Sequence, residues 1–257
     1  MRIALLLAAV AFAGACNASA PGGGAAKGNA AGGGQAQAAA SGAQASRDFQ
    51  VGAFDRINLT GAANVVVTVG GPPSVRAEGD AALVERLEIA VAGGELRIGM
   101  REGTWSGNHG GVTVRVTVPG LQAAAVAGAG DMRIDTIQGQ SFAATIGGAG
   151  DLDIGRLRVG NASFTLTGAG NIRAVGGARQ ASATLRGTGN LDLDGFEAAD
   201  ATVALSGTGS IELRATGTAQ VQLSGVGNVE IEGSARCTVA RSGLGHVRCG
   251  GNDVGQD

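Results

Sequence analysis

Aromatic side chains are scarce in this sequence. They account for 3% of its 257 residues, with one tryptophan and no tyrosine. Proteins that hold sugars or nucleic-acid bases by stacking use such rings, so the composition gives little support for a stacking platform. Charge is sparse as well, because 16% of the residues are charged and the net charge is −2. The chain lacks the basic surface on which nucleic-acid binding depends, and we expect no nucleic-acid partner.

The N-terminus lacks an apolar run long enough to cross a membrane. Its apolar stretch, residues 3–13, is about half of the roughly 20 residues that a spanning helix needs. The stretch follows Met1 and Arg2 and precedes small residues, which is the pattern of a secretory signal peptide. We therefore predict that residues 1–15 are a signal peptide and that the protein is exported.

Two cleavage sites compete after this stretch. Ala13-Gly14-Ala15-Cys16 resembles a bacterial lipobox, in which Cys16 becomes the lipidated first residue of the mature protein. Ala18-Ser19-Ala20 has the small residues of an ordinary site, but Pro21 would follow that cut. A lipid on Cys16 would anchor the protein while its body stays soluble. Since Asn17 is not the aspartate of an inner-membrane retention signal, we expect an outer-membrane lipoprotein, facing either the periplasm or the cell surface.

Glycine, in contrast, is abundant, and part of it belongs to a tether. The chain has 48 glycines, far above the usual share of about 7%. Residues 21–46 are almost entirely Gly, Ala, Gln and Ser, and such a segment cannot bury enough surface to offset its ordering entropy. We predict a disordered tether over residues 16–46, a folded body over residues 47–251 and a short tail over residues 252–257.

The remaining glycines follow a repeat. A Gly-x-Gly-polar-apolar motif occurs seven times between residues 128 and 247, at intervals of 18 to 20 residues. Its polar position is occupied by Asp131, Asp151, Asn171, Asn190, Ser210, Asn228 and His246. A tight corner favours glycine, because glycine adopts positive φ without steric cost. Each copy therefore marks a sharp turn.

Apolar residues alternate with polar ones on both sides of every motif. Leu166, Leu185 and Leu205 precede turns, and Ile172 and Leu191 follow them, in alternation with polar residues. A period of two indicates strands with one buried face. Because so small a unit cannot bury that face alone, the copies must stack. We predict an all-β fold, a parallel β-helix or related β-solenoid with about 18–20 residues per coil, and rank a β-sandwich second.

Residues 47–121 carry strand patterns without the full motif. Residues 61–65 look like a decayed copy of the turn, and residues 80–86 fit a short helix with Asp80 as its N-cap. Terminal repeats of a solenoid are atypical because they close an open end. We predict that this segment is the N-terminal cap and first coils, and that residues 122–251 are the regular repeats.

The order of these motifs resembles the bacterial head GIN domain family. The resemblance rests on Phe54 and Ile57, on Gly61, on Leu96-Arg97-Ile98, on the segment from Val114 to Leu121, and on the Gly-x-Gly-Asn repeats. It covers roughly residues 49–249. Members of that family are described as putative auto-transporter adhesins, so the resemblance implies a β-helical envelope domain.

The polar residues of the motif should form one column along the stack. This column could be a ligand or calcium groove, or a structural ladder of turn-capping side chains. Only Asp131 and Asp151 are carboxylates, and Leu152 stands where a calcium-binding nonapeptide repeat needs aspartate. We predict the structural ladder, and neither a metal nor a cofactor.

An enzyme is the weakest hypothesis. Polysaccharide lyases with β-helices need clustered carboxylates and long loops, and the acidic pairs here are Asp151 with Asp153 and Asp192 with Asp194. Residues two apart on a strand share a face, and such pairs usually belong to a solvated surface. With two histidines in the chain, no nucleophilic triad is indicated either.

Two cysteines remain once Cys16 is assigned to a lipid. Cys237 and Cys249 occupy inward columns of the last coil, on either side of Gly243-Leu244-Gly245. In an oxidising envelope compartment they could pair and fasten the open C-terminal end. We regard this as a possible disulfide.

The sequence favours a non-enzymatic, lipid-anchored binding or adhesion-type protein of the cell envelope. Its expected partners are the membrane, through the N-terminal lipid, and a surface polysaccharide or an envelope protein. A structural spacer in the periplasm is the second hypothesis, and a polysaccharide-active enzyme is the third.

Overall fold

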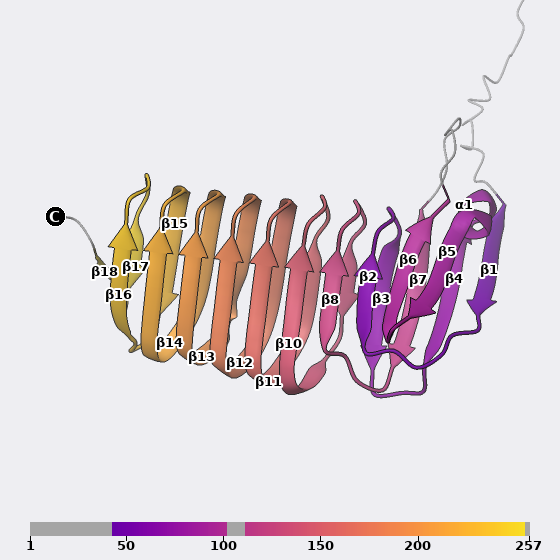
Figure 1. Cartoon of the computed structure of the whole chain (residues 1–257), viewed down its shortest axis with the longest axis horizontal. Coiled ribbons are helices and arrows are strands. Elements are labelled where there is room, and N and C mark those ends of the chain that lie inside the picture. The colour runs from indigo at the N-terminus through magenta and orange to yellow at the C-terminus, as the bar shows by residue number, and fades with distance from the viewer. Residues whose placement is uncertain (1–42, 102–110, 255–257) are drawn as a thin grey trace, which may run out of the picture. The chain divides into compact units, whose positions relative to one another are not determined.

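The computed structural model describes residues 43–101 and 111–254. These residues form eighteen strands of one continuous sheet and one short helix (Figure 1). The strands are β1 (Gln44–Phe49), β2 (Arg56–Leu59), β3 (Asn64–Val69), β4 (Ser74–Asp80), β5 (Leu87–Ala92), β6 (Glu95–Met100), β7 (Val112–Val118), β8 (Ala123–Val126), β9 (Met132–Ile134), β10 (Ile137–Ile146), β11 (Leu152–Leu166), β12 (Ala169–Leu185), β13 (Thr188–Leu205), β14 (Thr208–Leu223), β15 (Val226–Glu232), β16 (Arg236–Arg241), β17 (Val247–Cys249) and β18 (Asn252–Asp253); the helix is α1 (Ala81–Arg86).

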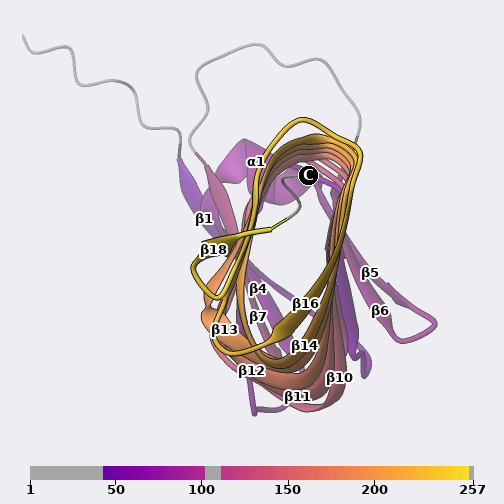
Figure 2. The ribbon, with the colours of Figure 1, turned by 90° about the vertical axis from the view of Figure 1, so that its left-hand side faces the viewer.

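The strands wind into a β-solenoid of about six turns with about 20 residues per turn. In the regular part a coil is largely one long strand, which runs along one side, bends, and returns along the other side to the next Gly-x-Gly turn (Figure 1). Seen along the stack, the coils superimpose as a flattened ring (Figure 2). Neighbouring coils pair in parallel, with Leu166 beside Leu185 and Leu185 beside Leu205. The predicted fold is confirmed.

The core consists of inward columns of small and medium apolar side chains. Leu166 and Leu185 are 0% exposed and Leu205 is 1% exposed, and their neighbours along the strand point outward. Burying one such leucine contributes about 1.5–3 kcal/mol. Phe164 and Phe196 meet edge to face inside the ring, with centroids 5.3 Å apart. The alternation of inward apolar and outward side chains along each strand holds each coil in register with the next.

The glycines of the turns are required mainly by the closeness of the coils. A Cβ on Gly209 would lie 1.7 Å from the carbonyl oxygen of Gly189, one coil earlier. Gly209 also has a φ of +144°. Gly207, the first glycine of that turn, has no positive φ, yet its Cβ would lie 2.1 Å from the oxygen of Gly187. The expectation that positive φ explains both glycines is therefore wrong for the first one, where backbone-to-backbone contact excludes a side chain.

The N-terminal part is a cap built around the first coil. Strands β2 and β3 form that coil, which stacks in parallel on β8 and β9. On its other side lie β6 and β7, and these pair in antiparallel fashion with β5 and β4. Helix α1 covers this end, and the Asp80 side chain accepts a hydrogen bond from the Ala82 N–H at 3.0 Å, as predicted for its N-cap.

Two boundaries differ from the sequence-based prediction. Strand β1 begins at Gln44, inside the segment assigned to the tether, because its backbone pairs with β4 and its Phe49 packs against the core. Strand β18 lies inside the predicted tail and pairs with β17, opposite Arg248 and Cys249. Both segments gain their order from backbone pairing, which composition does not reveal.

Within the described ranges, no helix is long and apolar enough to span a bilayer.

Candidate functional site

The solenoid presents two outer faces of different chemistry. The strand halves that lead into the Gly-x-Gly turns form what we call the hydroxyl face. Its outward side chains are Ala143, Thr145, Ser163, Thr165, Ser182, Thr184, Thr202, Ala204, Gln220 and Gln222. The halves that follow the turns form the charged face. Its central column is Arg133, Asp153, Arg173, Asp192, Glu212, Glu230 and Arg248.

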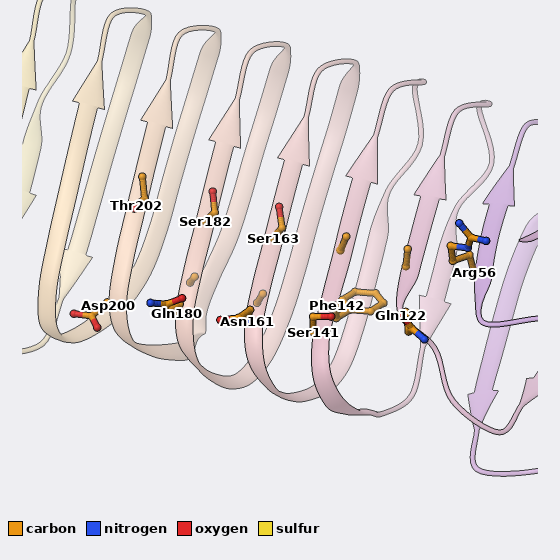
Figure 3. Close-up of a pocket in the computed structure, with 14 residues that line it drawn as sticks. Arg56, Gln122, Ser141, Phe142, Asn161, Ser163, Gln180, Ser182, Asp200 and Thr202 are labelled. Carbon is orange, nitrogen blue, oxygen red and sulfur yellow. The ribbon is translucent and has the colours of Figure 1, made fainter. Parts of the chain in front are cut away.

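A groove of about 590 Å³ crosses the hydroxyl face (Figure 3). It runs over successive coils, from Arg56 in the first coil to Thr202 on β13. Its lining consists of Arg56, Gln122, Ala123, Ser141, Phe142, Ala143, Asn161, Ala162, Ser163, Gln180, Ala181, Ser182, Asp200 and Thr202. This volume is within the range of small-molecule sites, although the groove is open to solvent along its length.

The strand register lines up the polar side chains of the groove in two columns. Asn161 lies beside Gln180, and Gln180 beside Asp200, near the beginning of the strand half that forms the hydroxyl face. Ser163 and Ser182 form the parallel column two residues further on. Figure 3 shows these side chains pointing out of the sheet from consecutive coils. They form a repeated row of hydrogen-bonding groups.

Several of these side chains are available to a ligand. Within residues 43–101 and 111–254, no protein hydrogen bond engages the side chains of Asn161, Gln180, Ser163 or Ser182. Asp200 accepts one bond, from the Thr218 hydroxyl at 2.5 Å. The amides and hydroxyls of this groove are therefore satisfied by solvent or by whatever binds there.

The charged face is engaged in ion pairs between coils. Arg133 bonds to Asp153 at 2.6 Å, and Arg173 Nε bonds to Asp192 at 2.8 Å. The hydrogen bond with Asp192 raises the pKa of the Arg173 guanidinium. Water and salt screen exposed pairs of this kind, so each pair adds little to stability and the column contributes mainly through its repetition.

Glu212 interrupts the alternation of charges in this column. Its neighbours one coil away on either side are Asp192 and Glu230, both acidic. Burial raises the pKa of Glu212, and the negative charges of Asp192 and Glu230 raise it further. In the described ranges no cation is paired with Glu212.

The polar residues of the repeat motif form a ladder of hydrogen bonds between coils. Five of the seven side chains, those of Asp131, Asp151, Asn171, Asn190 and Asn228, accept a bond from the backbone N–H of the equivalent residue one coil further on. The N–H groups of Asp151, Asn171, Asn190 and Ser210 bond to the side-chain oxygens of Asp131, Asp151, Asn171 and Asn190 at 3.0, 2.8, 3.2 and 3.1 Å, and that of His246 bonds to Asn228 at 3.3 Å. The ladder fastens the turns to one another.

The acidic pairs considered for catalysis are used in these contacts. Asp151 belongs to the ladder, and Asp153 and Asp192 pair with arginines. The Asp194 carboxylate accepts the N–H of Gly195 at 2.6 Å. In the described part of the chain, no three His, Cys, Asp or Glu side chains come together as a metal site.

The last coil is fastened covalently. Cys237 on β16 and Cys249 on β17 form a disulfide with their Cα atoms 6.4 Å apart. The bond links the two sides of the coil at the C-terminal end of the stack. Cys16, the predicted lipidation site, lies outside the described residues.

The groove on the hydroxyl face was not recognised from the sequence. A signal for it exists: the outward positions before each turn are Ala, Ser, Thr or Gln, whereas those after each turn are Arg, Asp or Glu. This asymmetry becomes visible once each turn divides a repeat into two faces. The depth of the groove, in contrast, depends on how the coils stack.

Comparisons with known proteins agree with this architecture. A family model described as "Putative auto-transporter adhesin, head GIN domain" matches residues 53–235. A crystal structure of a putative adhesin from Bacteroides fragilis is 22% identical, with a TM-score of 0.76, and the match covers 80% of this chain and 96% of that one. No curated protein sequence matches the chain.

Two further crystal structures share the fold. One is called a putative lipid binding protein, from Parabacteroides distasonis, at 18% identity and a TM-score of 0.64, covering 80% of this chain and 96% of that one. The other is a putative adhesin from Parabacteroides merdae, at 15% identity and a TM-score of 0.62, covering 80% of this chain and 95% of that one. At these identities the likeness shows the fold alone.

Proposed function

Because this chain belongs to the family described as "Putative auto-transporter adhesin, head GIN domain", we propose that it is a non-enzymatic, adhesion-type binding protein of the cell envelope. Its solenoid presents an extended surface to a polymer or to another protein, which is how stacked-repeat proteins generally bind. The rest of this proposal concerns which surface binds and where the protein is held.

One observation supports binding in preference to catalysis. The carboxylates that could serve an enzyme, Asp151, Asp153 and Asp192, are held in hydrogen bonds and ion pairs. General acid–base chemistry needs carboxyl groups that face the substrate and whose pKa values are shifted toward the working pH. The available polar groups instead lie in the open groove of the hydroxyl face. Apart from the Asp200 carboxylate, which accepts a bond from Thr218, they are amides and hydroxyls, which suit hydrogen bonding to a ligand.

The proposal includes a lipid anchor on Cys16. The N-terminal sequence supports export, and the Gly- and Ala-rich segment that follows Cys16 would let the solenoid extend from the membrane. In this arrangement the protein is an outer-membrane lipoprotein whose body reaches its partner through the tether. A structural spacer in the periplasm is the alternative, favoured by the ladder of Asn and Asp side chains that stiffens the stack.

Protease treatment of intact cells separates these two functions. We expect an added protease to digest the body on cells that express the native protein, while a periplasmic marker stays intact. The same cells should adhere to a polymer-coated surface more strongly than cells that lack the protein. Complete protection of the body in intact cells, together with unchanged adhesion, would reject the adhesion-type function and favour the spacer.

A further inference from the structure

We propose that the groove on the hydroxyl face binds an uncharged glycan chain that lies across successive coils. This inference rests on the proposed function and adds the site and the chemical class of the ligand. It follows from the side chains that line the groove, from their repetition, and from the lack of an available cation in its lining.

The rim of the groove carries groups that match sugar hydroxyls. Asn161 and Gln180 each offer two N–H donors and a carbonyl acceptor, and Asp200 offers a carboxylate that accepts bonds. The amides of Asn161 and Gln180 have no hydrogen-bond partner among residues 43–101 and 111–254. A hexose presents several hydroxyls that both donate and accept, so planar amides and carboxylates suit it.

The floor of the groove is low and mostly apolar. Ala143, Ser163 and Ser182 stand in one column and have short side chains, and the apolar part of the lining includes Phe142, Ala162 and Ala181, which are 2%, 4% and 5% exposed. A pyranose ring has a face of C–H groups that can lie against such a surface, with its hydroxyls directed to the polar rim. Apolar contact and hydrogen bonding then come from opposite sides of the same sugar.

The repetition of the groove suits a polymer. Asn161, Gln180 and Asp200 occupy equivalent positions on three consecutive coils. Coils stack at about 4.8 Å, so the six coils that the groove crosses, from β2 to β13, extend over about 24 Å. Several sugar units of an extended chain fit along this length, and because the groove is open the chain can continue beyond it.

The charges around the groove disfavour other ligands. Arg56, at one end, is paired with Asp55 and donates to the carbonyl oxygen of Gly93. A phosphate- or carboxylate-rich polymer would need several available cations, and the rest of the lining has none. An acyl chain would remain half exposed to water in so open a groove, beside amides and hydroxyls that it could not satisfy.

No exposed aromatic ring lines this groove, so stacking contributes nothing to binding. Affinity must come from the sum of modest contacts along several coils. We therefore expect longer glycans to bind more tightly than short ones of the same sugar.

The test uses affinity electrophoresis of full-length protein in which Cys16→Ser removes the lipid attachment point. Native gels contain dextran, laminarin or galactomannan as neutral probes, or polygalacturonate as an anionic probe, and oleate binding is followed by calorimetry. Ser182→Tyr places a large ring in the groove. Thr238→Tyr is the matched control, since Thr238 lies in the same column on β16 but outside the groove. Tyrosine is favoured in strands, and circular dichroism checks that both variants fold.

We expect at least one neutral polysaccharide to retard the parent protein and the Thr238→Tyr variant equally. Ser182→Tyr should raise the Kd for that polysaccharide at least tenfold. The inference is overturned if no neutral polysaccharide retards the protein, if both variants bind equally well, or if only polygalacturonate or oleate binds.

An adhesion assay on cells distinguishes failure of this inference from failure of the proposed function. If native cells adhere and Ser182→Tyr leaves adhesion unchanged, the protein is an adhesin that uses another surface, and the glycan site is rejected. If native cells adhere no better than cells lacking the protein, the proposed function itself is rejected.

Discussion

At the residue scale, the turns are set by the distance between neighbouring coils. The second glycine of each regular turn lies so close to the coil before it that a methyl group has no space. For Gly209 the nearest atom to an added Cβ is the Gly189 carbonyl oxygen, which is part of the backbone and cannot move without shifting a whole coil. The ladder residues just after the turns then add hydrogen bonds between most neighbouring coils.

Substituting this glycine should cost far more than a usual surface change. We expect Gly209→Ala to lower the free energy of unfolding by more than about 3 kcal/mol, because it combines a backbone clash with an unfavourable φ. Gly147→Ala is the control, since its Cβ would come no closer than 3.9 Å to the Thr167 hydroxyl and its φ is not positive. It should change stability by less than about 1 kcal/mol. Thermal and urea unfolding followed by circular dichroism compare the two, and equal effects would contradict the stacking argument.

Glu212 should make stability depend on pH in a direction opposite to that of most carboxylates. Its folded-state pKa is raised, so its stabilising contribution is complete below the ordinary glutamate value of about 4.3 and is lost as pH rises through the raised value. Above that raised value the ionised group lies between Asp192 and Glu230 and destabilises the fold. We expect Glu212→Gln to raise the melting temperature at pH 7 and to have little effect at pH 4.

Glu230→Gln serves as the comparison for that measurement. Glu230 accepts a hydrogen bond from Arg248 at 3.2 Å. We expect Glu230→Gln to weaken this ion pair and to lower stability slightly at pH 7, or to leave stability unchanged if the reduced repulsion between residue 230 and Glu212 compensates. A Glu212→Gln variant that is less stable than the parent at pH 7 would contradict the assignment of the raised pKa.

At the scale of the element, each regular coil depends on its neighbours, and the last coil has a neighbour on one side only. Its strand β16 is accordingly less buried than its counterparts, and Cys237 and Val239 are partly exposed where equivalent residues in earlier coils are buried. The disulfide between Cys237 and Cys249 compensates for the missing coil by linking the two sides of the ring.

Removing this disulfide should loosen the C-terminal end selectively. Closing so short a loop stabilises by about 2–3 kcal/mol. We expect the Cys237→Ser/Cys249→Ser variant to show faster amide hydrogen exchange in β16 and β17, with exchange in β12 and β13 unchanged. Uniformly faster exchange through the stack would instead show that the disulfide supports the whole solenoid.

At the scale of the whole body, the two ends and the two faces differ. The N-terminal end is closed by antiparallel strands and α1, whereas the C-terminal end is closed by a disulfide and the short β18. The charged face is engaged between coils, and the hydroxyl face carries the open groove. This division leaves one side of the stack for a partner. The described part of the chain begins at the capped end, because β1 is the first strand of the cap.

The anchor proposed on Cys16 can be tested by a single substitution. We expect the native protein to incorporate radiolabelled palmitate and to partition into the detergent phase of Triton X-114, whereas Cys16→Ala should do neither. Palmitate labelling that persists in Cys16→Ala would place the lipid on another residue, and a native N-terminus that begins at Pro21 would establish ordinary signal cleavage; either result would reject the anchor on Cys16. The Cys237→Ser/Cys249→Ser variant is the control, and it should be labelled like the native protein.

The sequence by itself determined the coil and its period. A repeat of 18 to 20 residues with alternating apolar positions can bury its apolar side only by stacking, and the glycines mark where the coils touch. The short helix after Asp80 was likewise predictable, since capping is a local property. The tertiary structure alone decided that Asn161, Gln180 and Asp200 line one groove. The bends between the two faces shift register, as between Ile154 and Leu157, and only packing of the core fixes such a shift. Local patterns therefore fixed the repeat, while long-range stacking fixed the surface on which binding is proposed.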